Sequence, residues 1–397
     1  MMSGLVVVLL GLGCGAPVPD VPAGPVEATV APVSVQPLPG ANRRTPKASW
    51  AADVDRYRGL LALNDRKVAA LGEKRGAAVF SERAGLHFAL YRLTGRDADF
   101  TSGLEAAAKA WETGKEQPGV RRAWADALQK QHRFAEALEV LEGLDAPGDR
   151  AARAAIRFEL GTYEPAMAEI AALLEATGRL PDAGLAARLA TMQWKLGRFE
   201  DAEASMALAQ KAYKGADGWV RGWHHLLLGL MDLDRQRYDD ALAHYRAADA
   251  AYPGWWLIEE HIAEIHLLQG RPAEALAIYD RVVPQTGSPE LMGSRAEALE
   301  ALGRKDDAEG LRAEARATFE RQLAANPTAF GGHALEFLLE HGEPAKALEL
   351  ARANADLRPN GESLLLLADA LEKSGSAGPA ADVRAQVVAS GWWVPPT

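Results

Sequence analysis

A short phrase recurs along most of the chain and constrains its fold more than any other feature. The phrase is a turn-forming residue, a variable residue, most often an aromatic residue or proline, two further residues and then alanine. Copies end at Ala137, Ala166, Ala202, Ala241, Ala275, Ala308, Ala347 and Ala380, and a weaker copy ends at Phe100. Each copy lies between two amphipathic stretches. Glycine suits the end of the first helix, and acidic residues suit the first turn of the second. The phrase therefore predicts a chain of helical hairpins.

The residue types and spacing of these copies resemble the tetratricopeptide repeat, a helix-turn-helix unit of about 34 residues. Successive alanines of the phrase are 29 to 39 residues apart. Twelve positions before the alanine, the family has a small residue. This chain has alanine or glycine there, except at Phe88 and Leu335. The resemblance implies an all-α, right-handed superhelical solenoid of about nine tetratricopeptide-like hairpins, in which the first helix of each hairpin lines a concave face.

The repeat copies divide the chain into an array and what precedes it. We assign residues 81–397 to the array. Residues 51–80 are expected to form an extra leading helix that caps it, because Val54, Tyr57 and Leu61 have helical spacing.

The N-terminal segment resembles a bacterial lipoprotein signal. Residues 5–12 are apolar but too few to span a bilayer, and they are followed by Gly13 and Cys14. The resemblance implies that residues 1–14 form a signal peptide and that Cys14 becomes the lipidated first residue. The alternative is a plain signal peptide with an incidental cysteine.

Residues 15–50 are rich in proline and poor in charge, which is typical of an extended, disordered linker. Such a tether suits a lipid-anchored protein. The signal and linker together predict a bacterial envelope protein, an outer-membrane lipoprotein facing the periplasm.

The charge is concentrated in the second half of the chain. The formal net charge is -10, and residues 222–397 hold 16 basic and 27 acidic residues. This argues against a nucleic-acid partner, which needs clustered positive charge. A basic protein or peptide partner is favoured instead.

Acidic residues recur at positions that would face the concave groove in the C-terminal hairpins. The expected partner-binding residues are Glu260, Glu264, Glu297, Glu300, Glu336, Glu340 and Asp369. A row of carboxylates along consecutive repeats would focus negative potential into the groove. The alternative is an ordinary solvated helix face.

Two histidine–glutamate pairs occupy equivalent repeat positions and suggest a metal-binding or catalytic alternative. His261 and Glu264 form one pair, and His333 and Glu336 form the other. Residues at i and i+3 share a helix face and can share a ligand. A metal site needs three or four converging ligands, and pairs two hairpins apart would not share one ion.

Two copies of Gly-Trp-Trp, beginning at Gly254 and Gly391, suggest packing between successive hairpins and a cap over the last one. Exposed tryptophans could also anchor a partner. No Walker A loop, G-x-S-x-G or H-E-x-x-H motif occurs in the sequence. We therefore predict a non-enzymatic interaction scaffold without a cofactor. A structural or pilot component of an envelope assembly is a further alternative.

Overall fold

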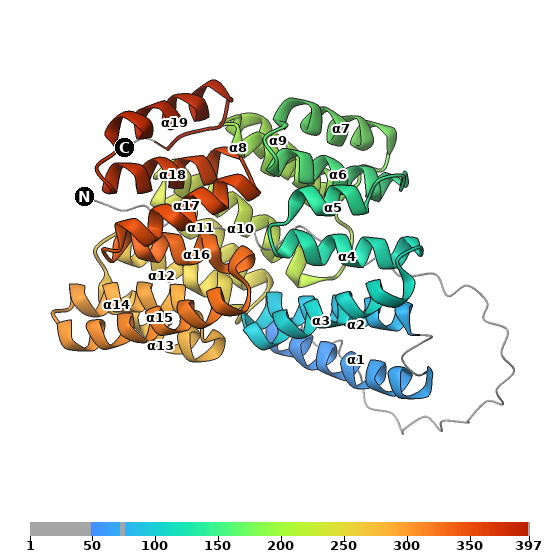
Figure 1. Cartoon of the computed structure of the whole chain (residues 1–397), viewed down its shortest axis with the longest axis horizontal. Coiled ribbons are helices and arrows are strands. Elements are labelled where there is room, and N and C mark those ends of the chain that lie inside the picture. Colours follow the sequence, from blue (N-terminus) through green and yellow to red (C-terminus); the bar gives the residue numbers. More distant parts are fainter. Residues whose placement is uncertain (1–48, 72–75, 396–397) are drawn as a thin grey trace, which may run out of the picture.

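A computed structural model describes residues 49–71 and 76–395 of the chain. Within these ranges the chain forms nineteen helices and no strand (Figure 1). The first nine are α1 (Trp50–Leu71), α2 (Ala77–Thr94), α3 (Asp97–Gly114), α4 (Pro118–Lys130), α5 (Phe134–Val140), α6 (Pro147–Glu159), α7 (Tyr163–Ala176), α8 (Ala183–Lys195) and α9 (Phe199–Ala212). The others are α10 (Gly218–Asp234), α11 (Tyr238–Ala251), α12 (Trp256–Leu268), α13 (Pro272–Thr286), α14 (Pro289–Ala301), α15 (Lys305–Ala325), α16 (Pro327–Glu340), α17 (Pro344–Leu357), α18 (Gly361–Lys373) and α19 (Ala377–Ala389).

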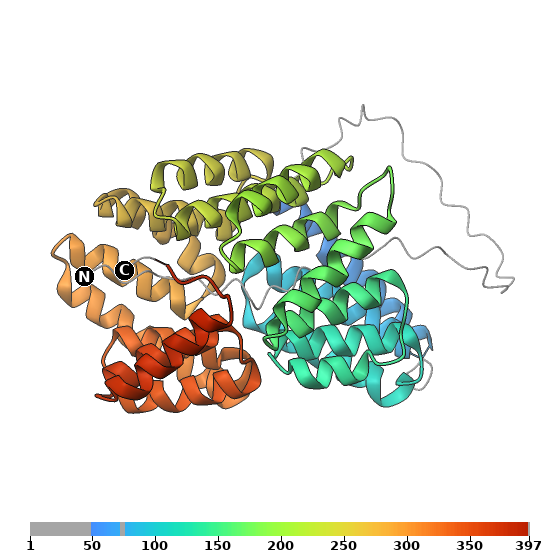
Figure 2. The same cartoon turned by 90° about the horizontal axis from the view of Figure 1, so that it is seen from above.

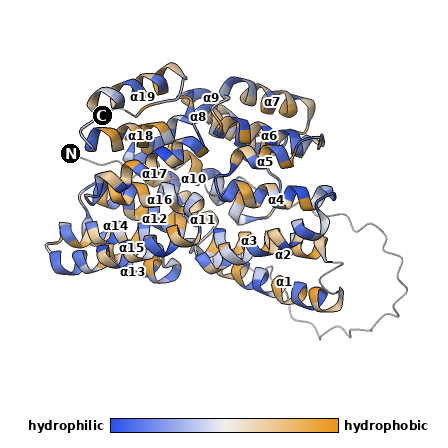
Figure 3. Cartoon of the chain, viewed as in Figure 1, coloured by the Kyte–Doolittle hydropathy of each residue, from blue (hydrophilic) through white to orange (hydrophobic). Residues whose placement is uncertain are grey.

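The helices after α1 pack as nine consecutive hairpins, from α2–α3 to α18–α19. Each hairpin also packs on the next, and the first helices of neighbouring C-terminal hairpins, α12, α14, α16 and α18, contact one another. Every helix carries both hydrophobic and hydrophilic residues (Figure 3). One hairpin cannot bury its apolar face alone, so stacking supplies the core. The predicted all-α superhelical array of nine hairpins is confirmed.

The recurring phrase forms the turn of every hairpin. Its first residue always has a left-handed backbone, which glycine adopts without steric cost. Two copies lack glycine, and there His132 and Gln236 take φ values of 57° and 59°. In eight of the nine turns described, the next residue's N–H donates to the carbonyl five residues earlier, as Arg271 does to His266 at 2.8 Å. This is the Schellman pattern, and the second helix then starts at the third residue of the phrase.

The small residue of the first helix makes room for the second helix. A Cβ atom added to Gly229 would lie 2.2 Å from the ring of Tyr245 in the same hairpin. In the first hairpin, Phe88 replaces the small residue. There Gly103 of α3 provides the space, because a Cβ atom on it would lie 2.6 Å from the Phe88 ring. The large Phe88 side chain is thus accommodated by a glycine on the second helix of the hairpin.

Residues at the junction of the fifth and sixth hairpins join this part of the array to its first helices. The Trp50 backbone N–H donates to the Pro253 carbonyl at 3.3 Å, and the Tyr252 hydroxyl donates to Asp53 at 2.8 Å. Trp255, which is fully buried, donates from its indole Nε1 to the carbonyl of Arg92 at 3.1 Å. Trp255 also packs on Trp219 and Trp223 of α10, with ring centroids 6.2 Å away in both cases. The first Gly-Trp-Trp copy therefore packs between successive hairpins, as predicted, and also joins hairpins far apart in the sequence.

The end of the array returns to its third and fourth hairpins. Trp392 packs against Phe158 and Tyr163, with ring centroids 6.0 and 5.4 Å away. The Trp393 backbone N–H donates to the Lys195 carbonyl at 3.0 Å. At the start of α18, the Gly361 N–H donates to the Tyr163 hydroxyl at 2.8 Å. The second Gly-Trp-Trp copy thus fastens the last hairpin to the N-terminal half.

A third contact between the two halves of the array joins α3 to α15 and α16. The Phe100 ring packs edge-on against Phe330 at 5.5 Å, and Gln322 donates to Asp97 at 2.8 Å. The two halves of the array therefore lie side by side, and the middle hairpins, along the top of Figure 2, connect them. The solenoid closes on itself, so much of its inner face is interior.

Cys14 and the signal peptide lie outside the described residues, as does nearly all of the proposed linker. No helix in the described ranges is long and apolar enough to cross a membrane.

The left-handed turn residue predicts opposite effects for two matched glycine substitutions. Gly270, at φ 70°, and Gly310, inside α15, both have open space where a Cβ atom would be added. We expect Gly270→Ala to lower the free energy of unfolding by about 1 kcal/mol, because alanine resists this backbone. Gly310→Ala should raise it by about 0.5–1 kcal/mol through helix propensity. Urea denaturation measures both, and equal effects from the two substitutions would contradict the turn assignment.

Candidate functional site

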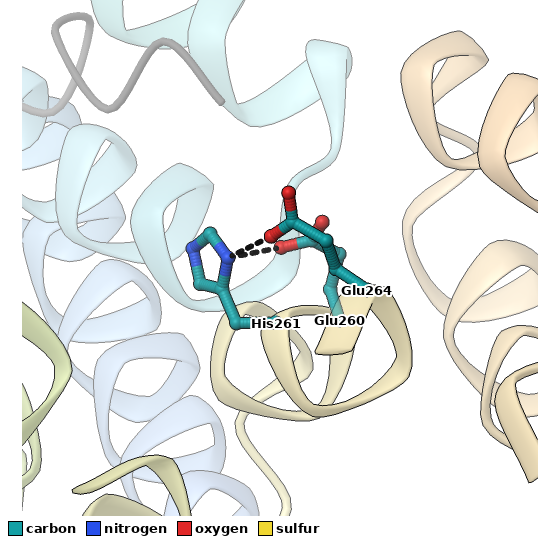
Figure 4. A group of neighbouring side chains, drawn as sticks. All are labelled: Glu260, His261 and Glu264. Carbon is teal, nitrogen blue, oxygen red and sulfur yellow. Dashed lines mark hydrogen bonds and ion pairs between the residues drawn. The ribbon is translucent and has the colours of Figure 1, made fainter. Parts of the chain in front are cut away.

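Three ionisable side chains of α12 converge in the interior of the closed array. The His261 Nδ1 atom lies 3.1 Å from Glu264 Oε2 and 3.3 Å from Glu260 Oε2 (Figure 4). The positions i, i+1 and i+4 bring the carboxylates to the same side of the imidazole. We call Glu260, His261 and Glu264 the His261 cluster. It is the one group of potential metal ligands found among the described residues.

The His261 cluster is enclosed on all sides. Glu260, His261 and Glu264 are 1%, 0% and 4% exposed. The Tyr245 ring stacks on the imidazole, with centroids 5.2 Å apart and planes inclined by 19°. Both Glu260 oxygens and the His261 Nε2 atom lack a hydrogen-bond partner in the described structure. A buried polar atom without a hydrogen bond destabilises the folded protein, so these atoms would gain from a bound ligand.

Burial also changes the proton affinities of the cluster. Loss of solvent raises the pKa of Glu260 to about 7, with a contribution from the charge of Glu264. It raises the pKa of Glu264 to about 8, with a contribution from Asp234. The same loss of solvent lowers the pKa of His261. The interior thus disfavours the charged form of all three groups.

Acidic residues continue from this cluster along the neighbouring first helices. We call Glu297 of α14 and Glu336 and Glu340 of α16 the acidic strip. Burial raises the pKa of Glu297 to about 7, and the charges of Glu340 and Glu264 raise it further. The pKa values of Glu336 and Glu340 are raised as well, chiefly by burial. The strip and the His261 cluster are therefore close enough to act on one another electrostatically.

The strip residues differ from most acids on the surface because the cations near them, Arg312, Arg358 and Lys373, act on them only at longer range. Glu297, Glu336 and Glu340 form no ion pair within the described part of the chain. The Glu336 Oε1 atom is buried without a hydrogen bond. These carboxylates are consequently available for a cation supplied from outside.

Two of the predicted groove residues, Glu300 and Asp369, each form an ion pair within their own hairpin. Glu300 forms an ion pair with Arg312 on the second helix of its own hairpin, and this bond lowers its pKa. Asp369 forms an ion pair with Arg384 of α19 at 2.5 Å. Both carboxylates are thus neutralised locally, whereas Glu260 and Glu264 are interior.

The second histidine pair of the sequence is not assembled like the first. The His333 Nδ1 atom lies 3.2 Å from Glu290 of α14, and no contact with Glu336 is found in the described structure. The alternative ligand set of His261, Glu264, His333 and Glu336 therefore does not come together. Glu260 joins His261 and Glu264 instead.

A buried arginine is a feature that the repeat pattern does not indicate. Arg358, between α17 and α18, is 0% exposed, and its two terminal nitrogens have no hydrogen-bond partner in the described structure. Burial raises the pKa of Glu159 to about 6 and also raises that of Glu336, and the charge of Arg358 opposes both rises. Arg358 thus partly compensates acids contributed by both halves. Its sequence signal is weak, because an arginine before proline normally reads as a solvated loop.

No family model and no curated protein matches the sequence. Solved structures are similar in shape. A tetratricopeptide repeat protein from Parabacteroides merdae is 17% identical, with coverage of 60% of this chain and 92% of its own, at a TM-score of 0.39. The human IFIT1 dimer with PPP-AAAA is 14% identical, with coverage of 84% and 88%, at 0.43. Pseudomonas aeruginosa PilF is 17% identical, with coverage of 60% and 91%, at 0.32. The hairpin assignment rests on the turns and contacts of this chain itself.

The raised pKa of Glu297 predicts a pH-dependent stability. Its carboxyl binds a proton more tightly in the folded than in the unfolded chain, so its stabilising effect is complete below pH 4.5 and is lost as pH rises through about 7. Glu297→Gln removes this titration. Between pH 5 and 8 the variant should lose less free energy of unfolding than the wild type, by up to about 3 kcal/mol.

The control is Glu300→Gln on the same helix, because the lowered pKa of Glu300 keeps it ionised across this pH range. Urea titrations of the three proteins at pH 5 and 8 make the comparison. Parallel pH slopes for wild type and Glu297→Gln would contradict the burial of this carboxyl.

Proposed function

We propose that the chain is a non-enzymatic protein-interaction scaffold whose acidic strip binds a segment of a partner protein rich in lysine or arginine. The observation that carries this proposal is the set of three neighbouring carboxylates, on α14 and α16, none of which forms an ion pair within the described residues. Placing like charges together is unfavourable, and a basic ligand relieves that repulsion while gaining charge-assisted hydrogen bonds.

Burial divides the predicted groove into two parts with different roles. Glu297 and Glu340 are partly exposed, which would let a ligand reach them without opening the array, whereas one oxygen of Glu336 is buried. Glu260 and Glu264 are enclosed and are not part of the proposed docking surface. The partner is therefore expected at the C-terminal hairpins, and the N-terminal half supports their arrangement.

The electrostatic contribution is expected to depend on salt and on pH. Screening weakens contacts between exposed charges, so affinity for a basic peptide should fall as ionic strength rises. The pKa of Glu297 near 7 means that its charge increases between pH 6 and 8. Binding of a cationic segment should strengthen over the same interval.

Charge reversal in the strip tests this function. We expect Glu297→Lys together with Glu340→Lys to weaken binding of a fluorescein-labelled decalysine peptide about tenfold or more at low salt, because two attractions become repulsions. Fluorescence anisotropy measures the dissociation constant.

The matched control is Glu136→Lys together with Glu164→Lys, which changes the net charge equally but replaces exposed acids of the N-terminal half. Similar losses for both double variants would attribute binding to net charge alone. Unchanged affinity in the strip variant would show that the acidic strip does not bind the peptide.

The proposal includes export and lipid attachment at Cys14, which would hold the scaffold at the periplasmic face of the outer membrane. The apolar run before Cys14 and the proline-rich residues after it support this location. The linker would allow the array to reach partners away from the membrane surface.

Substitution of the cysteine tests the anchor. In a Gram-negative host fed with an alkyne-labelled palmitate, we expect the full chain to take up label and to sediment with membranes. Cys14→Ser should remove the label and release the protein into the soluble periplasmic fraction. A labelled or membrane-bound Cys14→Ser protein would contradict lipidation at this residue.

A further inference from the structure

The donor atoms of the His261 cluster have the spacing of ligands around one metal ion. In a tetrahedral zinc site with bonds of about 2.0–2.1 Å, neighbouring ligand atoms are separated by about 3.3 Å. The two separations between His261 Nδ1 and the carboxylate oxygens are 3.1 and 3.3 Å. One ligand atom of each residue lies within 4.8 Å of the others. A small ion placed among them needs little side-chain movement.

Hydrogen bonding within the cluster does not satisfy its members. The Nδ1 atom of His261 can donate one proton, and two carboxylate oxygens face it (Figure 4). Glu260 is left without a hydrogen bond at either oxygen although it is 1% exposed. No lysine or arginine pairs with Glu260 or Glu264 in the described ranges. Two adjacent buried carboxylates therefore lack a cation.

The surroundings of the cluster are also polar and unsatisfied. The hydroxyl of Tyr245 is buried and has no hydrogen-bond partner in the described structure. The charges of Glu260 and Glu264 act on this hydroxyl and on that of Tyr279. A metal-bound water is a natural partner for such hydroxyls, and a three-residue ligand set leaves a coordination position for it.

We propose that Glu260, His261 and Glu264 bind one divalent transition-metal ion of the zinc class. One imidazole and two carboxylates suit Zn²⁺ and its first-row neighbours better than Ca²⁺, which takes six or more oxygen ligands. The ion would neutralise the paired carboxylates inside the closed array and stabilise that conformation. None of its three ligands belongs to the acidic strip, so metal binding and peptide binding are measured with separate variants and either can fail without the other.

The test uses the full chain, purified without a histidine tag, stripped with EDTA and titrated with Zn²⁺ by isothermal calorimetry. We expect one equivalent to bind the wild type and to raise its melting temperature, because an ion that binds only the folded state stabilises it. Glu264→Gln, which nearly preserves side-chain volume, and His261→Asn, which removes the imidazole, should each weaken binding about a hundredfold, since each removes one of three ligands.

The matched controls are Glu259→Gln and His266→Asn on the same helix, outside the cluster, and they should bind Zn²⁺ like the wild type. A wild-type protein that takes up less than one equivalent overturns the proposal, whatever the variants do. Tight binding that survives in Glu264→Gln and His261→Asn also overturns it, because the metal would then be held elsewhere. Helical circular dichroism confirms that each variant is folded. If both site variants unfold, the absorption spectrum of Co²⁺-loaded wild type decides, and spectral features of free aqueous Co²⁺ overturn the site.

Discussion

Contacts between hairpins far apart in the sequence determine the arrangement of this molecule. Stacking of neighbours gives each hairpin a partner for its apolar face, but stacking alone produces an open superhelix. Two groups of aromatic residues close it. Trp50, Tyr252 and Trp255 join α1 and α2 to the junction of α11 and α12, and Trp392 and Trp393 join the end of the chain to α6–α9. These rings bury large areas and also satisfy backbone carbonyls, so they add both apolar burial and hydrogen bonds to the closure.

Closure determines the chemistry of the inner face. In an open solenoid, Glu260 and Glu264 would face solvent and remain ionised. In the closed array they are almost fully buried, and their pKa values rise towards or above neutrality. The strip residues on α14 and α16 are less enclosed, although one oxygen of Glu336 is buried. This difference in enclosure is why we propose an ion for the cluster and a basic segment for the strip. The buried Arg358 offsets part of this negative charge where the two halves meet.

The local structure was predictable from the sequence because it depends on local rules. The turn phrase predicts where each first helix ends, and the left-handed residue occurs in all nine copies, including His132 and Gln236. The closure was not predictable, since Trp255 and Trp392 make contacts that span more than 150 residues and follow no period. The repeat pattern predicts that Glu260 and Glu264 face the inner side of the array. It does not predict that they are buried, because their burial depends on the closure. His333 pairs with Glu290 of the preceding hairpin. The spacing of residues within one helix cannot predict such a contact between helices.

The most direct test of the closed array is a distance between its two halves in solution. Thr162 and Pro359 are exposed and lie at the meeting point of α6–α7 and α18, where an added Cβ atom on Gly161 would be 3.1 Å from the Pro359 carbonyl. Spin labels at both positions, in a Cys14→Ser background, report their separation by double electron–electron resonance. The closed array predicts a narrow distribution below about 25 Å. An open stack would separate hairpins six steps apart by about 50 Å, at 8–10 Å for each packed layer. A distribution centred there would contradict closure and, with it, the enclosed site.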